Sequence, residues 1–245
     1  MLAFLDDLRK NGDSGKSVYI PAGLSSQRVS HLIGEVNPEN AAPELSELIA
    51  SSITGAVIFW GESSKHLVIP PFPLVEERLD HGFVVEPLYT LLNQNFEIAL
   101  ILVRLGAYAV GLCRGQSFIS SEVGTGNIHA RHRQGGSSAK RFQRHREKQI
   151  ESFLTRVCSH IQSILQPNAK SVDYVVYGGA ETTILLLQKR CPFLKQFDDH
   201  CLPPLLDIAQ PSRKVLETSF HRTWSSRIIE WHSNTVSQPT DKFSS

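Results

Sequence analysis

The chain has 245 residues, of which 41% are hydrophobic and 20% are charged, and its formal net charge is only +1. This composition is typical of a globular protein with one large domain or two small ones. Its four cysteines are too few for a disulfide-stapled scaffold, so we expect reduced, buried thiols. No apolar run reaches the ~18 residues that a membrane-spanning helix needs. The N-terminus has no secretory signal, so the sequence predicts a cytoplasmic protein that does not associate with membranes.

The first part of the chain alternates short helices and strands. The spacing of apolar residues predicts helices over 2–10, 24–33, 43–52 and 87–93, and strands over 17–21, 55–61, 66–70 and 83–85. The strands at 55–61 and 66–70 are expected to form a hairpin. The prolines at 70–73 predict an extended linker after it.

The pattern changes at about residue 97, where an antiparallel meander is predicted over 97–104, 107–115 and 116–124. A polar, glycine-rich stretch over 124–138 predicts an exposed, mobile loop. The elements expected after it are a long helix from Ser138 that ends at Pro167, a strand over 172–179, a helix over 180–190, a strand over 205–209 and a helix over 211–231. The fold class is therefore α/β (α+β), with a mixed sheet and flanking helices. The predicted domains are an N-terminal α/β domain over 1–95, a second domain over 96–232 and a disordered tail over 233–245.

The charge of this nearly neutral chain is unevenly distributed. Residues 129–148 contain seven Lys or Arg and one acid, a net charge of +6, whereas the rest of the chain has a net charge of −5. Such a block repels itself unless an anionic partner offsets the charge. Arginine predominates in the block, and its planar guanidinium suits phosphates and bases. A Gly-Gly pair lies within the block, which favours a mobile tip followed by a cationic helix that enters a cavity lined by nucleic acid.

The motifs around this block resemble a known family. They are Gly124-Thr125-Gly126, then residues 131–138 (RHRQGGSS), then residues 141–147 (RFQRHRE). Together they resemble the central domain of the eukaryotic/archaeal class-one peptide-chain release factor superfamily. The closest branch is the one that releases peptidyl-tRNA in ribosome quality control, with its bacterial release-factor-like relatives. The resemblance covers most of residues 15–230 and is strongest over 97–195.

The resemblance implies an RNase H-like fold for the second domain and no cofactor. It implies that the Gly-Gly loop enters the peptidyl transferase centre and frees nascent chains from peptidyl-tRNA on stalled large ribosomal subunits. The partners would be the rRNA of that subunit and peptidyl-tRNA. The candidate catalytic residues are Gln134, Gly135, Gly136, Ser137 and Ser138. The candidate RNA-binding residues are Arg131, Arg133, Lys140, Arg141, Arg144 and Arg146.

The sequence departs from the family pattern at one position. Release factors place a glutamine after Gly-Gly, whereas Gly136 is followed by Ser137. Either Gln134 positions the water, or the loop amides and the serines suffice. Alternatively, the bond cut is a tRNA phosphodiester, with His129 or His132 as acid or base. In the last alternative the protein binds rRNA, tRNA or the ribosome without catalysis.

Other candidate sites are weaker. The cysteines lack the paired spacing of zinc sites, and only two acids, Glu97 and Asp173, start strands where a two-metal nuclease would need three. We therefore expect no metal. Gly178-Gly179 is interpreted as a tight turn rather than a phosphate site. Phe142 is equally compatible with stacking on RNA and with anchoring the helix.

Overall fold

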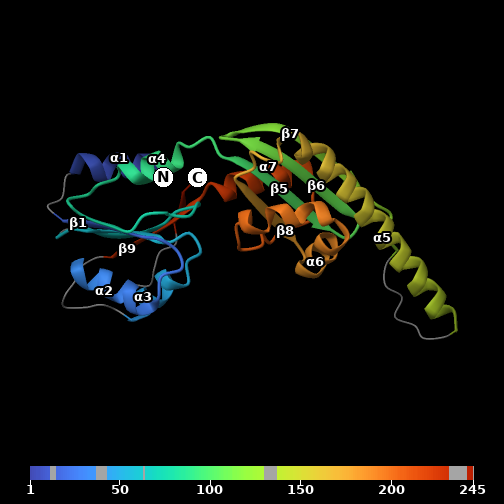
Figure 1. The fold of residues 1–245 in the computed structure, drawn as a ribbon, viewed down its shortest axis with the longest axis horizontal. Coiled ribbons are helices and arrows are strands. Elements are labelled where there is room, and N and C mark those ends of the chain that lie inside the picture. The colour runs from blue at the N-terminus through green and yellow to red at the C-terminus, as the bar shows by residue number, and fades with distance from the viewer. Residues whose placement is uncertain (12–14, 37–42, 63, 130–136, 232–241, 245) are drawn as a thin grey trace. The chain divides into compact units, whose positions relative to one another are not determined.

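The computed structural model describes residues 1–11, 15–36, 43–62, 64–129, 137–231 and 242–244 (Figure 1). The chain divides into two compact units. The first consists of Met1–Gln94 with His221–Ser245, and the second of Asn95–Phe220. Both contain a β-sheet with flanking helices, so the predicted mixed α/β class is confirmed. None of the helices in the described ranges combines the length and apolarity needed to cross a membrane.

The first unit is a sheet with helices on both faces. Its strands follow the order β10-β9-β3-β2-β1-β4, and every neighbouring pair is antiparallel. The strands are β1 (Lys16–Ile20), β2 (Ala56–Trp60), β3 (Lys65–Ile69), β4 (Arg78–His81), β9 (Ser226–Trp231) and β10 (Lys242–Ser244). The helices are α1 (Leu2–Asn11), α2 (Ser26–Val36), α3 (Pro43–Ala50) and α4 (Glu86–Leu92).

Two apolar cores hold this unit together, one on each face of the sheet. Helices α2 and α3 cover one face, where Ile33 and Ile49 pack with Ile20 and Ile58. Helices α1 and α4 cover the other, where Leu5 packs in a cluster with Phe59 and Leu88. Strands β1, β2 and β3 are therefore largely buried, whereas the edge strand β4 is exposed. Burial on both sides explains the continuous apolar runs of the central strands.

The second unit is a four-stranded mixed sheet. Strands β5 (Glu97–Arg104), β6 (Ala107–Arg114) and β7 (Ser117–Thr125) form the predicted meander, and β8 (Tyr174–Gly179) pairs in parallel with β5. The strand order is β7-β6-β5-β8. The helical elements are α5 (Ser137–Leu165), the 3-10 turn η1 (Gln166–Asn168), α6 (Glu181–Arg190), the 3-10 segment η2 (Pro192–His200) and α7 (Arg213–Thr223).

Helices α5 and α6 cover one face of this sheet. Phe153, Val157 and Ile161 of α5 and Leu187 of α6 are at most 3% exposed and pack on Ile101 and Val110. On α7, Leu216 is fully buried and the Phe220 ring lies 5.2 Å from that of Phe118 on β7. The contacts of Phe153, Val157 and Ile161 thus fix the C-terminal half of α5 on the sheet.

Several sequence predictions are wrong. The strand predicted at 83–85 lies instead at β4, and 205–209 contributes only an isolated bridge between Leu206 and Gly178. The helix predicted over 211–231 ends at Thr223, and Ser226–Trp231 is β9, which pairs with β3 of the first unit. The division at residue 220 therefore differs from the predicted domain end at 232. In the predicted tail, Lys242–Ser244 forms β10, and the residues 233–241 and 245 lie outside the described ranges.

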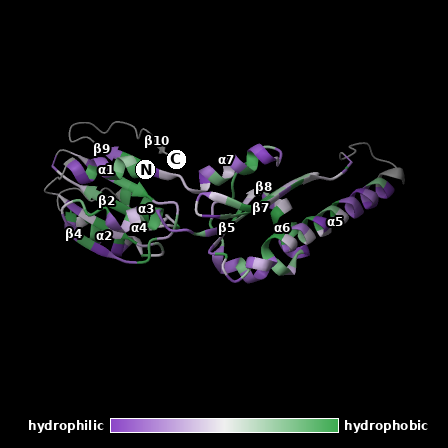
Figure 2. Cartoon of the chain, turned by 90° about the horizontal axis from the view of Figure 1, so that it is seen from above, coloured by the Kyte–Doolittle hydropathy of each residue, from purple (hydrophilic) through white to green (hydrophobic). Residues whose placement is uncertain are grey.

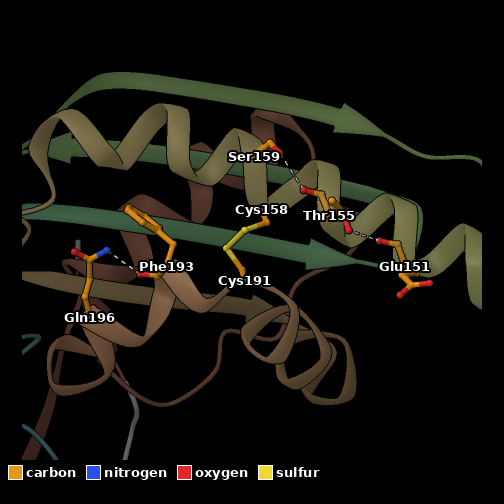
Figure 3. Close-up of a disulfide and its surroundings, with 7 residues drawn as sticks. All are labelled: Glu151, Thr155, Cys158, Ser159, Cys191, Phe193 and Gln196. Carbon is orange, nitrogen blue, oxygen red and sulfur yellow. Dashed lines mark hydrogen bonds between the residues drawn. A yellow bond between two sulfur atoms is a disulfide. The ribbon is translucent and has the colours of Figure 1, made fainter.

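The prediction of four reduced thiols is also wrong. Cys158 of α5 and Cys191, the C-cap of α6, form a disulfide with their Cα atoms 5.4 Å apart (Figure 3). Cys113 and Cys201 are free. Burial of Cys113 raises the pKa of its thiol to about 12, so this cysteine is an inert core residue.

Candidate functional site

The N-terminal half of α5, Ser137–Gln149, is the cationic part of the second unit. In Figure 1 this half extends beyond the sheet, and in Figure 2 most of it is hydrophilic. No residue from Lys140 to Gln149 is buried, and the first buried side chain after them is Phe153. At ~1.5 Å per residue, this half presents roughly 20 Å of helix to a partner.

Its residue types explain why this half is helical without a core. Lys, Arg, Gln and Glu lose little side-chain freedom in a helix and rank high in helix propensity. Gln143 also donates a hydrogen bond to Glu147 one turn later, at 2.9 Å. The packed C-terminal half supplies a preformed helical end from which this part continues, which removes the cost of nucleation.

The cations of this half fall on two sides of the helix. Lys140, Arg141, Arg144 and Lys148 are exposed. Arg144 lies four residues after Lys140, three after Arg141 and four before Lys148, so the four side chains share a face. Arg146 lies on another side, seven residues before Phe153, and its Nε donates to the backbone carbonyl of His129 at 3.0 Å. The structure therefore brings together three of the predicted RNA-binding residues, adds Lys148, and gives Arg146 a bond within the chain.

The remaining predicted residues are less fully described. Arg131, Arg133, Gln134, Gly135 and Gly136 lie outside the described residues, as does His132. Ser137 and Ser138 are the first residues of α5. Phe142 is 49% exposed within the cationic half, so it is not a core anchor.

The Gly124-Thr125-Gly126 motif joins β7 to α5. A Cβ on Gly124 would lie 2.5 Å from the Tyr108 ring, and one on Gly126 would lie 2.4 Å from the ring of Phe153. Both glycines therefore permit close packing of aromatic rings. Between them, the Thr125 carbonyl accepts a hydrogen bond from the Arg156 guanidinium of α5 at 2.8 Å.

A polar network holds the same junction further along the helix. Glu122 of β7 accepts a hydrogen bond from Tyr108 Oη at 3.1 Å and lies 2.7 Å from His160 Nδ1 of α5. The rings of Tyr108 and His160 stack with centroids 5.2 Å apart. Burial, with the Glu122 hydrogen bond, raises the pKa of Tyr108 to about 12, so the phenol stays a donor. The junction fixes the base from which the cationic half extends.

A groove of about 660 Å³ between α5 and α6 does not extend the cationic face. Its lining mixes Glu147 and Glu151 with Lys189 and Arg190 around apolar side chains. Arg190 is ion-paired with Glu151. A polyanion in this groove would therefore meet acidic side chains as well as basic ones, so the groove is poorly suited to bind it.

The two acids considered for metal chemistry have structural partners. Glu97 is 6% exposed and accepts hydrogen bonds from Arg114 Nε at 2.8 Å and from the Ser171 hydroxyl at 2.7 Å. Asp173 accepts the Glu97 backbone N–H at 2.7 Å. Burial opposes ionisation of Glu97, but the Ser171 and Arg114 bonds outweigh it and lower its pKa. Within the described residues no group of three potential metal ligands occurs.

Gly178 and Gly179 serve packing. A Cβ on Gly179, whose φ is +130°, would lie 2.0 Å from the Val103 carbonyl oxygen, and one on Gly178 would lie 2.6 Å from Leu102. The pair allows β8 to approach β5 and turn into α6, which agrees with the tight-turn interpretation.

Comparison with known families places the chain in the class-one release factor superfamily. A family model described as "Actinobacteria/chloroflexi VLRF1 release factor" matches residues 96–229, more than half of the chain. The chain belongs to this VLRF1 release factor family, and the resemblance found in the sequence is confirmed.

The chain is also similar to individual release factors and to one of their solved structures. Peptide chain release factor subunit 1 of Pyrococcus abyssi is 27% identical over 210 residues, covering 73% of this chain and 51% of that protein. Its Thermococcus sibiricus counterpart is 32% identical over 143 residues, covering 53% and 34%. The chain thus spans about half or less of these relatives. The crystal structure of the archaeal termination factor aRF1 aligns with a TM-score of 0.38 and 17% identity, over 90% of this chain and 72% of that one.

Proposed function

We propose that this protein is a ribosome-associated release factor that frees nascent chains from peptidyl-tRNA on stalled large ribosomal subunits, as part of rescue or quality control in the cytoplasm. The observation that carries the proposal is the exposed cationic half of α5, which directly follows the sequence Gln134-Gly135-Gly136 in a member of a release factor family. A run of arginines and lysines without a buried side is suited to rRNA and tRNA phosphates.

In this proposal the residues divide into two roles. Lys140, Arg141 and Arg144 bind RNA phosphates, together with Arg131, Arg133 and Arg146. Gly135 and Gly136 allow close approach to the reacting bond. Gln134, Ser137 and Ser138 are the nearest candidates for positioning a water molecule or binding the developing oxyanion.

The second candidate is a non-catalytic protein that binds rRNA, tRNA or the ribosome. One observation favours it, namely that Ser137 follows Gly136 where release factors have a glutamine. Both candidates use the same cationic face, so binding alone does not separate them.

The test uses purified large ribosomal subunits that carry labelled peptidyl-tRNA. We expect free peptide with intact tRNA on a denaturing gel, and loss of release in Gly136→Val, in which a side chain obstructs close approach. Loss in Gln134→Ala would assign the water-positioning role to Gln134. A shortened tRNA would instead indicate phosphodiester cleavage. Intact peptidyl-tRNA with normal binding would contradict release and support the non-catalytic alternative.

A further inference from the structure

The chain leading from β7 towards residue 130 is held against α5 at its last described residue. The backbone N–H of His129 donates to Gln149 Oε1 at 3.2 Å, and its carbonyl accepts from Arg146 Nε at 3.0 Å. Both backbone polar groups of one exposed residue are thus bound by side chains from a single helix. Exposed backbone groups usually bond to water, so paired side-chain partners indicate a specific arrangement.

A third α5 residue completes this arrangement. The imidazole rings of His129 and His145 lie with centroids 5.9 Å apart at an interplanar angle of 30°. Gln149 Nε2 lies 3.3 Å from His145 Nε2, within hydrogen-bonding distance. We call His129, His145, Arg146 and Gln149 the His129 clip.

The clip continues the junction formed by the Gly124-Thr125-Gly126 motif. Gly126 packs against Phe153, and Gln149 lies one helical turn before Phe153 on the same side. Between residues 125 and 129 the backbone is therefore tied to α5 at both ends, by Arg156 at Thr125 and by the clip at His129. Two fixed points define both the path and the register of this segment along the helix.

We propose that Gln149 and Arg146 are positioning residues for the release reaction, an inference that rests on the proposed function. By fixing the backbone of His129, they set the point on α5 from which the chain continues to Gln134, Gly135 and Gly136. A displacement of about 1 Å at a reacting group can cost ~10²-fold in rate. The Gln149 amide acts through His129 and need not touch the substrate. Arg146 uses its Nε for the same purpose, in addition to the phosphate contact proposed for its charge.

Gln149→Ala is the decisive variant because it removes the clip's acceptor without changing charge. Its matched control is Gln143→Ala, which removes the same side chain from the same exposed half; within the described residues Gln143 bonds along α5 to Glu147. Gln149→Glu is the conservative variant, since a carboxylate still accepts the His129 N–H. Loss of one exposed hydrogen bond is too small a change to unfold the unit.

The first measurement is amide hydrogen exchange of residues 125–129 in the free protein. We expect faster exchange in Gln149→Ala and Arg146→Ala, and exchange like that of the unmodified protein in Gln143→Ala and Gln149→Glu. Unchanged exchange in both Gln149→Ala and Arg146→Ala would show that the His129 clip does not hold residues 125–129. This result would not depend on any measurement of activity.

The second measurement is single-turnover peptide release at varied protein concentration on the loaded large subunits. We expect Gln149→Ala to lose roughly 10–100-fold in the maximal rate, with the half-saturating concentration changed less than twofold and the rate recovered in Gln149→Glu. An unaltered maximal rate in Gln149→Ala would overturn the positioning role while leaving the proposed function intact. No release by the unmodified protein would instead refute the proposed function, and the positioning role with it.

Discussion

The two halves of α5 belong to one continuous helix but depend on different parts of the molecule. The C-terminal half buries Phe153, Val157 and Ile161 against the sheet, whereas no residue between Lys140 and Gln149 is buried. Tertiary packing therefore stabilises the C-terminal half. The N-terminal half is maintained by helix propensity and by its continuity with the packed half. An exposed helix with four cations on one face gains nothing for folding from that charge, so its composition is best explained by an anionic partner.

The largest expected contrast is between the phenylalanines of the two halves. Phe153→Ala removes a ring that is 3% exposed and should lower the free energy of unfolding by about 3–5 kcal/mol. Phe142→Ala, at a ring that is 49% exposed, should cost less than about 1 kcal/mol. Urea unfolding followed by circular dichroism measures both. Similar losses in the two variants would show that the cationic half is also held by packing.

The disulfide distinguishes the two halves because it joins the packed half of α5 to α6. It joins residues 33 apart in the sequence, and such a loop constrains the unfolded chain by roughly 2–4 kcal/mol. Reduction with a dithiol should therefore lower the melting temperature without weakening RNA binding. The Cys158→Ser/Cys191→Ser variant should show the lower melting temperature already and be insensitive to reductant. An equal fall in melting temperature when that variant is reduced would contradict the assignment of the stabilisation to this disulfide.

A smaller effect is expected at Glu97, at the start of β5 in the packed region. Its pKa is lowered from the ordinary value of 4.5, so the unfolded chain binds a proton more readily than the folded one. The stabilisation is therefore present above the unfolded pKa and is lost as pH falls through the lower, folded pKa. Glu97→Gln should cost about 1–2 kcal/mol at pH 7, and the cost should shrink below pH ~4. A cost that does not change with pH would contradict a depressed pKa.

Local patterns predicted most elements of both units, including the meander β5–β7 and the full extent of α5. They failed at β9, where Ile228 packs with the core on one face of the sheet and Ile229 with the core on the other. A strand covered on both faces has no polar–apolar alternation, and its partner β3 lies about 160 residues earlier in the chain. Such a non-local pairing leaves no trace in the neighbouring sequence.

The candidate site was predictable in composition and less so in geometry. Charge clustering identified the cationic half, and the three- and four-residue spacing of Arg141, Arg144 and Lys148 would have indicated their common face. The bonds of Arg146 and Gln149 to His129 were missed because they join residues that are 17 and 20 positions apart in the sequence. Gly124 and Gly126 were the available signal, since paired glycines before a helix indicate close packing.

If the exposed half of α5 binds ribosomal RNA through its cationic face, the affinity for purified large subunits should fall steeply with salt. Arg141→Glu/Arg144→Glu should weaken binding and reduce the slope of log affinity against log salt by about 1–2, at ~0.7–0.9 for each phosphate that the protein no longer neutralises. Lys170→Glu/Lys195→Glu makes the same charge change at exposed positions outside this half and should leave the slope near that of the unmodified protein. Equal slopes in the two double variants would contradict binding through the cationic face.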